Sequence, residues 1–94
     1  MKIEWSADAL ADLDRFGAFL HRHYPSLARV VAREIIEKAR LLGEQPQLGH
    51  PIAGREDYRQ IVLRALNAAY VFQYRIDRER LVILRVFHSR ESRE

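Results

Sequence analysis

The chain has 94 residues, of which 48% are apolar and 31% charged, and its formal net charge is +3. This composition is typical of a folded chain, and the length predicts a single domain over residues 1–94. The sequence has no cysteine, which excludes disulfides, thiol catalysis and thiolate metal sites. No apolar run approaches the roughly 20 residues of a membrane-spanning helix. The N-terminal segment lacks a signal-peptide core, so we expect a cytoplasmic protein that makes no membrane contact.

The first 24 residues predict a short strand and an amphipathic helix. Residues 2–5 alternate polar and apolar side chains, as a strand with one apolar face does. Ser6 can cap the following helix, and Asp8 would stabilise its positive end. Asp12 is among the charged residues that fall off the apolar stripe of this helix. The predicted stripe consists of Leu10, Leu13, Gly17, Leu20 and Tyr24, with Phe16 beside it.

A second helix is predicted after a break at residues 24–26. Pro25 is suited to the first turn of a helix, and Gly43 is expected to end it. The short connection requires the two helices to be antiparallel neighbours. Residues 43–57 contain three glycines and two prolines, which predicts an irregular loop. The apolar stripe of the second helix consists of Leu27, Val31, Ile35, Ala39 and Leu42.

Three strands rich in β-branched and aromatic residues are predicted over residues 58–63, 69–77 and 80–90. Their short connections favour an antiparallel meander. Alternation places one set of the middle strand on one face: Tyr70, Phe72, Tyr74 and Ile76. In the last strand it groups Val82, Leu84 and Val86 against Leu81, Ile83, Arg85 and Phe87. Both faces of that strand are largely apolar, which indicates a central strand or a face that a partner completes.

Few residues are suited to chemistry. The four histidines have no metal-ligand spacing, and no phosphate-binding glycine loop is present, so neither a metal nor a cofactor is expected. Every basic residue after position 44 is arginine, which suits either carboxylates or phosphates. A metal-independent ribonuclease needs an acid, a base and cations around the phosphate. His88 could exchange a proton while Arg59 and Arg85 bind phosphate. Equally, His88 could be an ordinary strand-end residue and the arginines could pair with acidic side chains.

Five short motifs occur in order along nearly the whole chain. They are Trp5-Ser-x-x-Ala-x-x-Asp-Leu13, Leu42-Gly-x-x-Pro46-x-x-Gly49, Tyr58-Arg59, Tyr70-Val-Phe-x-Tyr74-Arg-Ile76 and Val82-Ile-Leu-Arg-Val-Phe-His88-x-Arg90. Together they resemble the RelE/ParE superfamily of bacterial toxins. The resemblance implies an α+β fold of order β-α-α-β-β-β, with a helical hairpin packed on a largely antiparallel four-stranded sheet.

The resemblance also implies the toxin of a type II toxin–antitoxin pair, which a cognate antitoxin neutralises by covering the open apolar face and the arginines. Operator DNA would be reached only through the antitoxin. RelE-like members cut messenger RNA on the ribosome with basic residues and a C-terminal tyrosine or histidine, whereas ParE-like members inhibit DNA gyrase. This chain has no lysine after Lys38 and no tyrosine after Tyr74, so it is more similar to ParE.

The expectation is therefore a protein that inhibits DNA gyrase by direct binding, with no catalytic residues. The residues expected to contact the target or the antitoxin are Arg75, Arg85, Phe87, His88, Arg90 and Arg93. The alternative is a ribosome-dependent mRNA endonuclease that uses Arg59, Arg85 and His88. A third possibility is an interaction module that has lost its toxicity.

Overall fold

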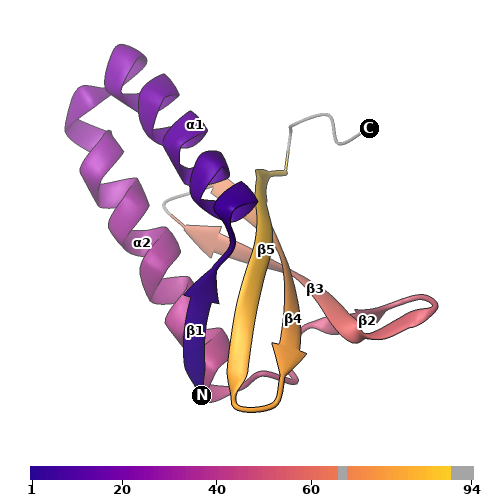
Figure 1. Cartoon of the computed structure of the whole chain (residues 1–94). Helices are drawn as coiled ribbons and strands as arrows, with labels where there is room; N and C mark the ends of the chain where they lie inside the picture. Colours follow the sequence, from indigo (N-terminus) through magenta and orange to yellow (C-terminus); the bar gives the residue numbers. More distant parts are fainter. Residues whose placement is uncertain (66–67, 90–94) are drawn as a thin grey trace.

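A computed structural model describes residues 1–65 and 68–89 of the chain. Its elements are β1 (Lys2–Trp5), α1 (Ala7–His23), α2 (Pro25–Glu44), β2 (His50–Ile52), β3 (Arg55–Ala65), β4 (Ala68–Asp77) and β5 (Arg80–His88). The strands form one sheet in the order β1-β5-β4-β3-β2, in which β1 and β5 are parallel and the other neighbours are antiparallel. Figure 1 shows the α1–α2 hairpin on one side of this sheet. The predicted α+β class and helical hairpin are confirmed.

The prediction of four strands is wrong, because the sheet has five. The additional strand β2 lies within residues 43–57, which the glycines and prolines had marked as a loop. It is only three residues long and occupies the sheet edge, where Pro51 removes no hydrogen bond from the interior of the sheet. Gly54 lies in the turn into β3 and has a φ of +77°, a backbone conformation that other residues rarely adopt.

The buried face of α1 differs from the predicted stripe. Ala9, Asp12 and Phe16 are its buried residues, whereas Leu10 and Tyr24 are about half exposed. The helix packs against both α2 and β5. Its buried residues therefore face the space between these two elements and do not coincide with the predicted apolar stripe. The predicted stripe of α2 is buried as expected except for Leu27, which lies near the closed end of the hairpin and is exposed.

The core lies between the hairpin and the sheet. The predicted inner face of β4 is confirmed, since Tyr70, Phe72 and Tyr74 are buried in the core cluster. The face assignment in β5 is wrong, because the inward residues are Leu81, Ile83 and Val86. Gln73 pairs with Arg85 and Tyr74 with Ile83, which leaves Leu84 as an extra residue in β5. This β-bulge shifts the alternation by one residue. Of the two alternatives left open for this strand, the structure shows the interior position, since β5 lies between β1 and β4.

Within residues 1–65 and 68–89, no helix covers the second face of the sheet (Figure 1). Val71 and Val82 are buried but lie outside the core cluster, as alternation requires of residues on this second face. Val62 is 56% exposed there. Gln73 donates a hydrogen bond to Gln60 across the two strands at 2.9 Å. This face is therefore a mixed apolar and polar surface that is open to a partner.

Candidate functional site

The first predicted site residue, Arg85, is held by a buried carboxylate. Asp12 on α1 is 1% exposed. Its Oδ2 accepts hydrogen bonds from Arg85 Nε at 2.9 Å and from the Val86 backbone N–H at 2.8 Å. Its Oδ1 accepts from Arg85 Nη2 at 3.0 Å and from Arg15 Nη1 at 2.7 Å. Burial alone would raise the pKa of Asp12, but the donors outweigh it and hold the pKa below the ordinary value of 3.8.

The start of α1 takes over hydrogen bonding where β1 ends. β1 pairs with β5 only as far as Trp5 and Ile83. Beyond that point, the Ser6 hydroxyl donates to the Leu84 carbonyl at 2.9 Å and accepts from the Ala9 N–H at 3.0 Å. The carboxylate described above then accepts the next edge N–H of β5. Unpaired backbone groups are costly when buried, so this arrangement explains why polar α1 side chains face the bulge of β5.

The second predicted site residue, Arg59, holds the segment that connects α2 to β2. Its Nη1 donates to the Gly49 carbonyl at 2.6 Å, and its Nη2 donates to the Gln47 side chain. The Tyr74 hydroxyl lies beside it, donating to the Pro46 carbonyl at 2.7 Å and accepting from the Gly49 N–H at 2.8 Å. Burial raises the pKa of this tyrosine. A Cβ at Gly49 would lie 2.6 Å from the Tyr74 hydroxyl oxygen, so only glycine fits there.

His88, at the end of β5, belongs to an aromatic row. Its ring meets the Tyr70 ring edge-on at 5.4 Å between centroids, and Tyr70 meets Phe16 in the same manner at 5.5 Å. The row connects the sheet end to the buried face of α1. Half-buried His88 therefore contributes to packing as well as presenting an ionisable ring at the sheet end.

The structure does not assemble Arg59, Arg85 and His88 around one point. Along β4, Arg59 lies opposite Tyr74 and His88 lies opposite Tyr70. Four residues of strand separate the backbone at these two positions by about 13 Å, so the side chains would have to turn toward each other to share one phosphate. Arg59 and Arg85 are also directed to different protein partners, the 46–49 segment and α1. The alternative catalytic set is therefore three separate residues in this arrangement.

Of the other predicted contact residues, some make contacts within the protein and others lie outside the described residues. Arg75 forms an ion pair with Asp77 at 3.2 Å, and Arg80 pairs with both Asp77 and Glu4. Hydrogen bonds from Arg80 and then Arg75 lower the pKa of Asp77. The Arg85 guanidinium also lies 4.7 Å from the centre of the Phe87 ring. Arg90 and Arg93 lie outside the described residues.

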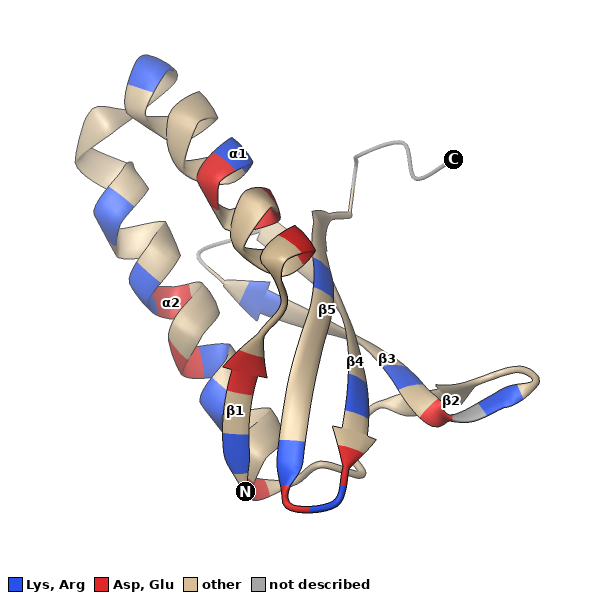
Figure 2. Ribbon diagram, viewed as in Figure 1, with Lys and Arg blue, Asp and Glu red and all other residues tan. Residues whose placement is uncertain are grey.

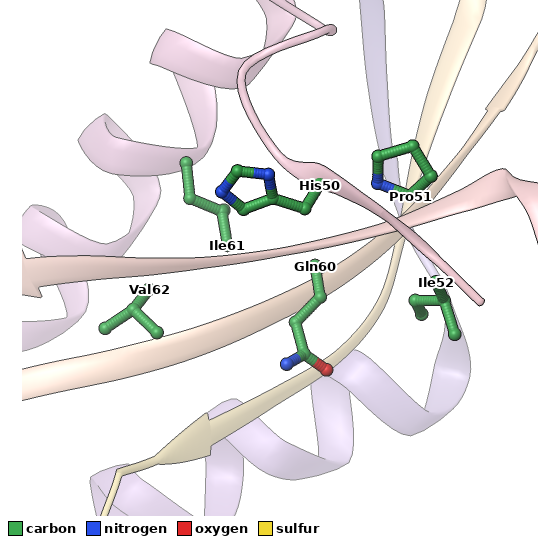
Figure 3. A pocket seen from close by; sticks show the side chains of 6 residues that line it. All are labelled: His50, Pro51, Ile52, Gln60, Ile61 and Val62. Carbon is green, nitrogen blue, oxygen red and sulfur yellow. The ribbon is translucent and has the colours of Figure 1, made fainter.

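A surface hollow of about 500 Å³ lies at the β2–β3 edge. Its lining is His50, Pro51, Ile52, Gln60, Ile61 and Val62. Figure 3 shows Gln60 and Val62 pointing away from Ile61, so no group of polar side chains converges there. None of the predicted site residues that the structure describes lines it. Within residues 1–65 and 68–89 there is no cluster of three or more His, Asp or Glu side chains that could hold a metal ion.

Two features of these surroundings were not predicted from the sequence. The burial of Asp12 could not be predicted from the helical pattern of apolar residues. Its partner Arg85 is 73 residues away in the sequence, and a single acidic residue does not indicate such a partner. The role of Tyr74 in fixing the 46–49 segment was likewise hidden, although Pro46 and Gly49 belong to one of the recognised motifs. Among the described helices, none is long and apolar enough to cross a membrane.

Comparison with known proteins gives consistent matches. A family model described as the ParE toxin of type II toxin-antitoxin system, parDE, matches residues 3–93. The toxin-designated protein Y4kP of Sinorhizobium fredii (strain NBRC 101917 / NGR234) is 38% identical over 93 residues, which cover 97% of this chain and 91% of that protein. A structure of the chromosomal ParDE TA system from P. aeruginosa has a TM-score of 0.75 at 21% identity and covers 94% of this chain and 95% of that chain.

A further match is the intact E. coli RelBE toxin–antitoxin complex, with a TM-score of 0.65 at 17% identity over 96% of this chain and 98% of that chain. At identities this low, the structural matches show a shared fold. The family model and the 38% identical relative extend over almost the whole sequence. The similarity therefore includes both the hairpin and the sheet.

Proposed function

The chain belongs to the family of ParE toxins of type II toxin–antitoxin systems, and from this premise we propose that it inhibits DNA gyrase by direct binding. In this proposal the chain performs no chemistry of its own. A cognate antitoxin protein binds it and blocks that contact.

The observation that carries the proposal is the engagement of the two candidate phosphate ligands. Arg85 is paired with a carboxylate that is 1% exposed, and Arg59 is hydrogen-bonded to the 46–49 segment. Releasing Arg85 toward RNA would remove two of the four hydrogen bonds of the buried Asp12 carboxylate, and releasing Arg59 would remove the donor to the part-buried Gly49 carbonyl. Each loss costs about 1–3 kcal/mol. An endonuclease needs such groups available at one point. A binding protein needs only an intact fold and an accessible surface.

The antitoxin is proposed to cover the sheet face that the helices leave open. Val62 is exposed on that face, and Phe87 lies opposite Val71 on the same side. Arg75 lies on the same face by alternation and suits an acidic segment, whereas Arg85 is held by Asp12. The E. coli RelE relative was solved in complex with its antitoxin, which supports a protein partner for this chain. Any contact with operator DNA would be made through the antitoxin.

The test is supercoiling by purified DNA gyrase with and without the purified chain. We expect inhibition by the wild-type chain, and inhibition within threefold of wild type by His88→Ala. A parallel assay follows cleavage of messenger RNA on translating ribosomes. Unaffected gyrase together with RNA cleavage, and a loss of roughly 10²–10⁴-fold on His88→Ala, would overturn the proposal in favour of the ribonuclease.

A further inference from the structure

The closed end of the helical hairpin stands clear of the sheet (Figure 1). We refer to residues 19–33 as the hairpin tip. Residues 21–27, which join the two helices, are all exposed. The tip is formed by the ends of two long helices whose other ends are packed on the sheet, so it is a helical projection and not a loop.

The hairpin tip exposes several apolar and aromatic side chains. Phe19 is 56% exposed and Tyr24 is 55% exposed. His23 lies between them, with ring centroids 4.6 Å from Phe19 and 6.4 Å from Tyr24. The first two turns of α2 add two exposed aliphatic residues, Leu27 and Val30, which are 45% and 39% exposed. Clustered exposed apolar side chains of this kind mark interaction sites more often than scattered ones do.

The charge of the hairpin tip has one sign. No Asp or Glu occurs between Asp14 and Glu34, whereas Arg22, Arg29 and Arg33 lie in that interval. All three arginines are exposed. Figure 2 shows the contrast with the lower part of the molecule, where acidic and basic residues are interspersed. Within the part of the chain that the structure describes, the ion pairs join residues of α1 near the sheet, of α2 beyond the tip and of the strands, and these three arginines make none.

We propose that the hairpin tip is the surface by which the chain binds its target protein, at an apolar pocket rimmed by acidic residues. Aromatic anchors beside arginines are the side chains most often found in binding hot spots. Basic charge without acidic neighbours steers a partner of the opposite sign. This inference rests on the proposed function, and it identifies which part of the chain makes the contact with gyrase.

A protein partner fits the hairpin tip better than a nucleic acid does. The His23 ring lies against those of Phe19 and Tyr24, whereas single-stranded binding presents separate rings for stacking bases. Binding to duplex DNA depends on many phosphate contacts, and the hairpin tip offers only three arginines. The hairpin tip combines exposed aromatic side chains with arginines, two kinds of side chain in which protein interfaces are enriched.

The test compares matched surface variants of the whole chain. Phe19→Ala is paired with Leu10→Ala, which removes an equally exposed apolar side chain from the sheet end of the same helix. Arg22→Glu/Arg29→Glu is paired with Arg40→Glu, which reverses an exposed charge on α2 outside the hairpin tip. The readouts are the Kd for purified gyrase and growth arrest after expression without antitoxin. Circular dichroism confirms that each variant is folded.

We expect each hairpin-tip variant to weaken gyrase binding by about 30-fold, the effect of losing one hot-spot contact, while the two controls stay within threefold. Wild-type binding that survives both hairpin-tip changes would overturn the inference and leave the proposed function standing. If the wild-type chain arrests growth without binding gyrase, the proposed function fails. In that case, loss of arrest in the hairpin-tip variants supports this surface, and retained arrest overturns it.

Two further outcomes would reassign the surface. Binding of the wild-type chain to a duplex oligonucleotide that the hairpin-tip variants lose, with gyrase binding unchanged, would make the hairpin tip a nucleic-acid site. Full toxicity of the variants with loss of rescue by the antitoxin would make it the antitoxin site. Either result overturns the inference as stated.

Discussion

The two ends of the α1–α2 hairpin are built in opposite ways. At the sheet end, a buried aspartate accepts four hydrogen bonds and the serine cap is bonded both to its own helix and to the bulge of β5. At the closed end, rings and arginines are exposed. The carboxylate end contributes to folding, while the closed end has surface that the fold does not use. Arginines at the sheet end therefore stabilise this chain, whereas arginines at the closed end are available to a partner protein.

The comparison makes Arg85 the informative residue. Its position in a recognised motif near the C-terminus predicted a role in target contact or phosphate binding. Its actual partner is Asp12, and the pair connects the first helix to the last strand. Loss of toxicity on replacing Arg85 would therefore be ambiguous, because an unstable fold would have the same effect. Variants that separate stability from activity are needed.

The largest expected effect is at the anchored end. Asp12→Ala leaves the Arg85 charge and the Val86 N–H without their acceptor, so we expect a loss of about 3 kcal/mol in the free energy of unfolding. Urea denaturation followed by circular dichroism measures it. Asp14→Ala, an exposed change on the same helix, should stay within about 0.5 kcal/mol. Equal effects of the two substitutions would mean that the buried Asp12 carboxylate stabilises the fold no more than the exposed Asp14 carboxylate does.

The 46–49 segment offers a second test of the anchored side. Tyr74→Phe removes the hydroxyl that bridges the Pro46 carbonyl and the Gly49 N–H, and we expect a loss of about 2 kcal/mol. Tyr24→Phe, which removes a hydroxyl from an exposed residue of the hairpin tip, should have no measurable effect on stability. The pair is compared by thermal or urea unfolding. If Tyr74→Phe were neutral, the hydroxyl would not hold this segment.

The dependence of stability on pH sharpens the account of Asp12. Its pKa in the folded chain lies below the ordinary value of 3.8, so folding favours the ionised form. This contribution is fully present above about pH 5 and is lost as the pH falls through 3.8 toward the lower, folded-state pKa. We expect Asp12→Asn to be less stable than the wild type at pH 7, with the difference shrinking as the pH approaches 3. A constant difference across that range would exclude ionic stabilisation by this residue.

A smaller effect is expected where α1 begins. Ser6→Ala removes the helix cap and the bond to the Leu84 carbonyl, at a cost of about 1 kcal/mol. Ser26→Ala, in the first turn of α2, is the control, because no side-chain hydrogen bond caps that helix. Denaturant midpoints at neutral pH distinguish the two. Equal midpoints would mean that the connection between β1 and α1 does not depend on this hydroxyl.

The smallest effect on stability belongs to the hairpin tip. Arg22→Glu/Arg29→Glu changes two exposed residues that make no ion pair among the described residues, so the free energy of unfolding should change by no more than about 0.5 kcal/mol. The same variant is expected to lose target binding. A large loss of stability in it would show that the hairpin tip also supports the fold and would weaken the contrast between the two ends.

Local sequence patterns were sufficient for the helices and the meander. Ser6, Pro25 and the alternation in β4 are local signals, and they place the elements correctly. The extra residue at Leu84 could not be predicted, because a bulge depends on what α1 presents to β5. β2 was missed for a related reason: Pro51 is acceptable only because that strand lies at an edge.

The candidate site was predicted less well than the fold. Arg59 and Arg85 were identified as functional from their residue type and motif positions, but their partners are 10 and 73 residues away in the sequence. Only the three-dimensional arrangement shows that both arginines are bonded within the protein.

The hairpin tip, in contrast, is visible in the sequence as an interval without acidic residues. Its exposure depends on the sheet being too short to cover it.

We infer that Arg85 acts through Asp12 and not on the target. The most direct measurement is growth arrest by Asp12→Asn/Arg85→Gln, a double variant that removes both charges and retains hydrogen-bonding groups at both positions. Folding of the variant is verified by circular dichroism. The account predicts that the folded double variant still arrests growth. A fully folded double variant without toxicity would contradict it, because the arginine would then be needed by the target and not by the fold.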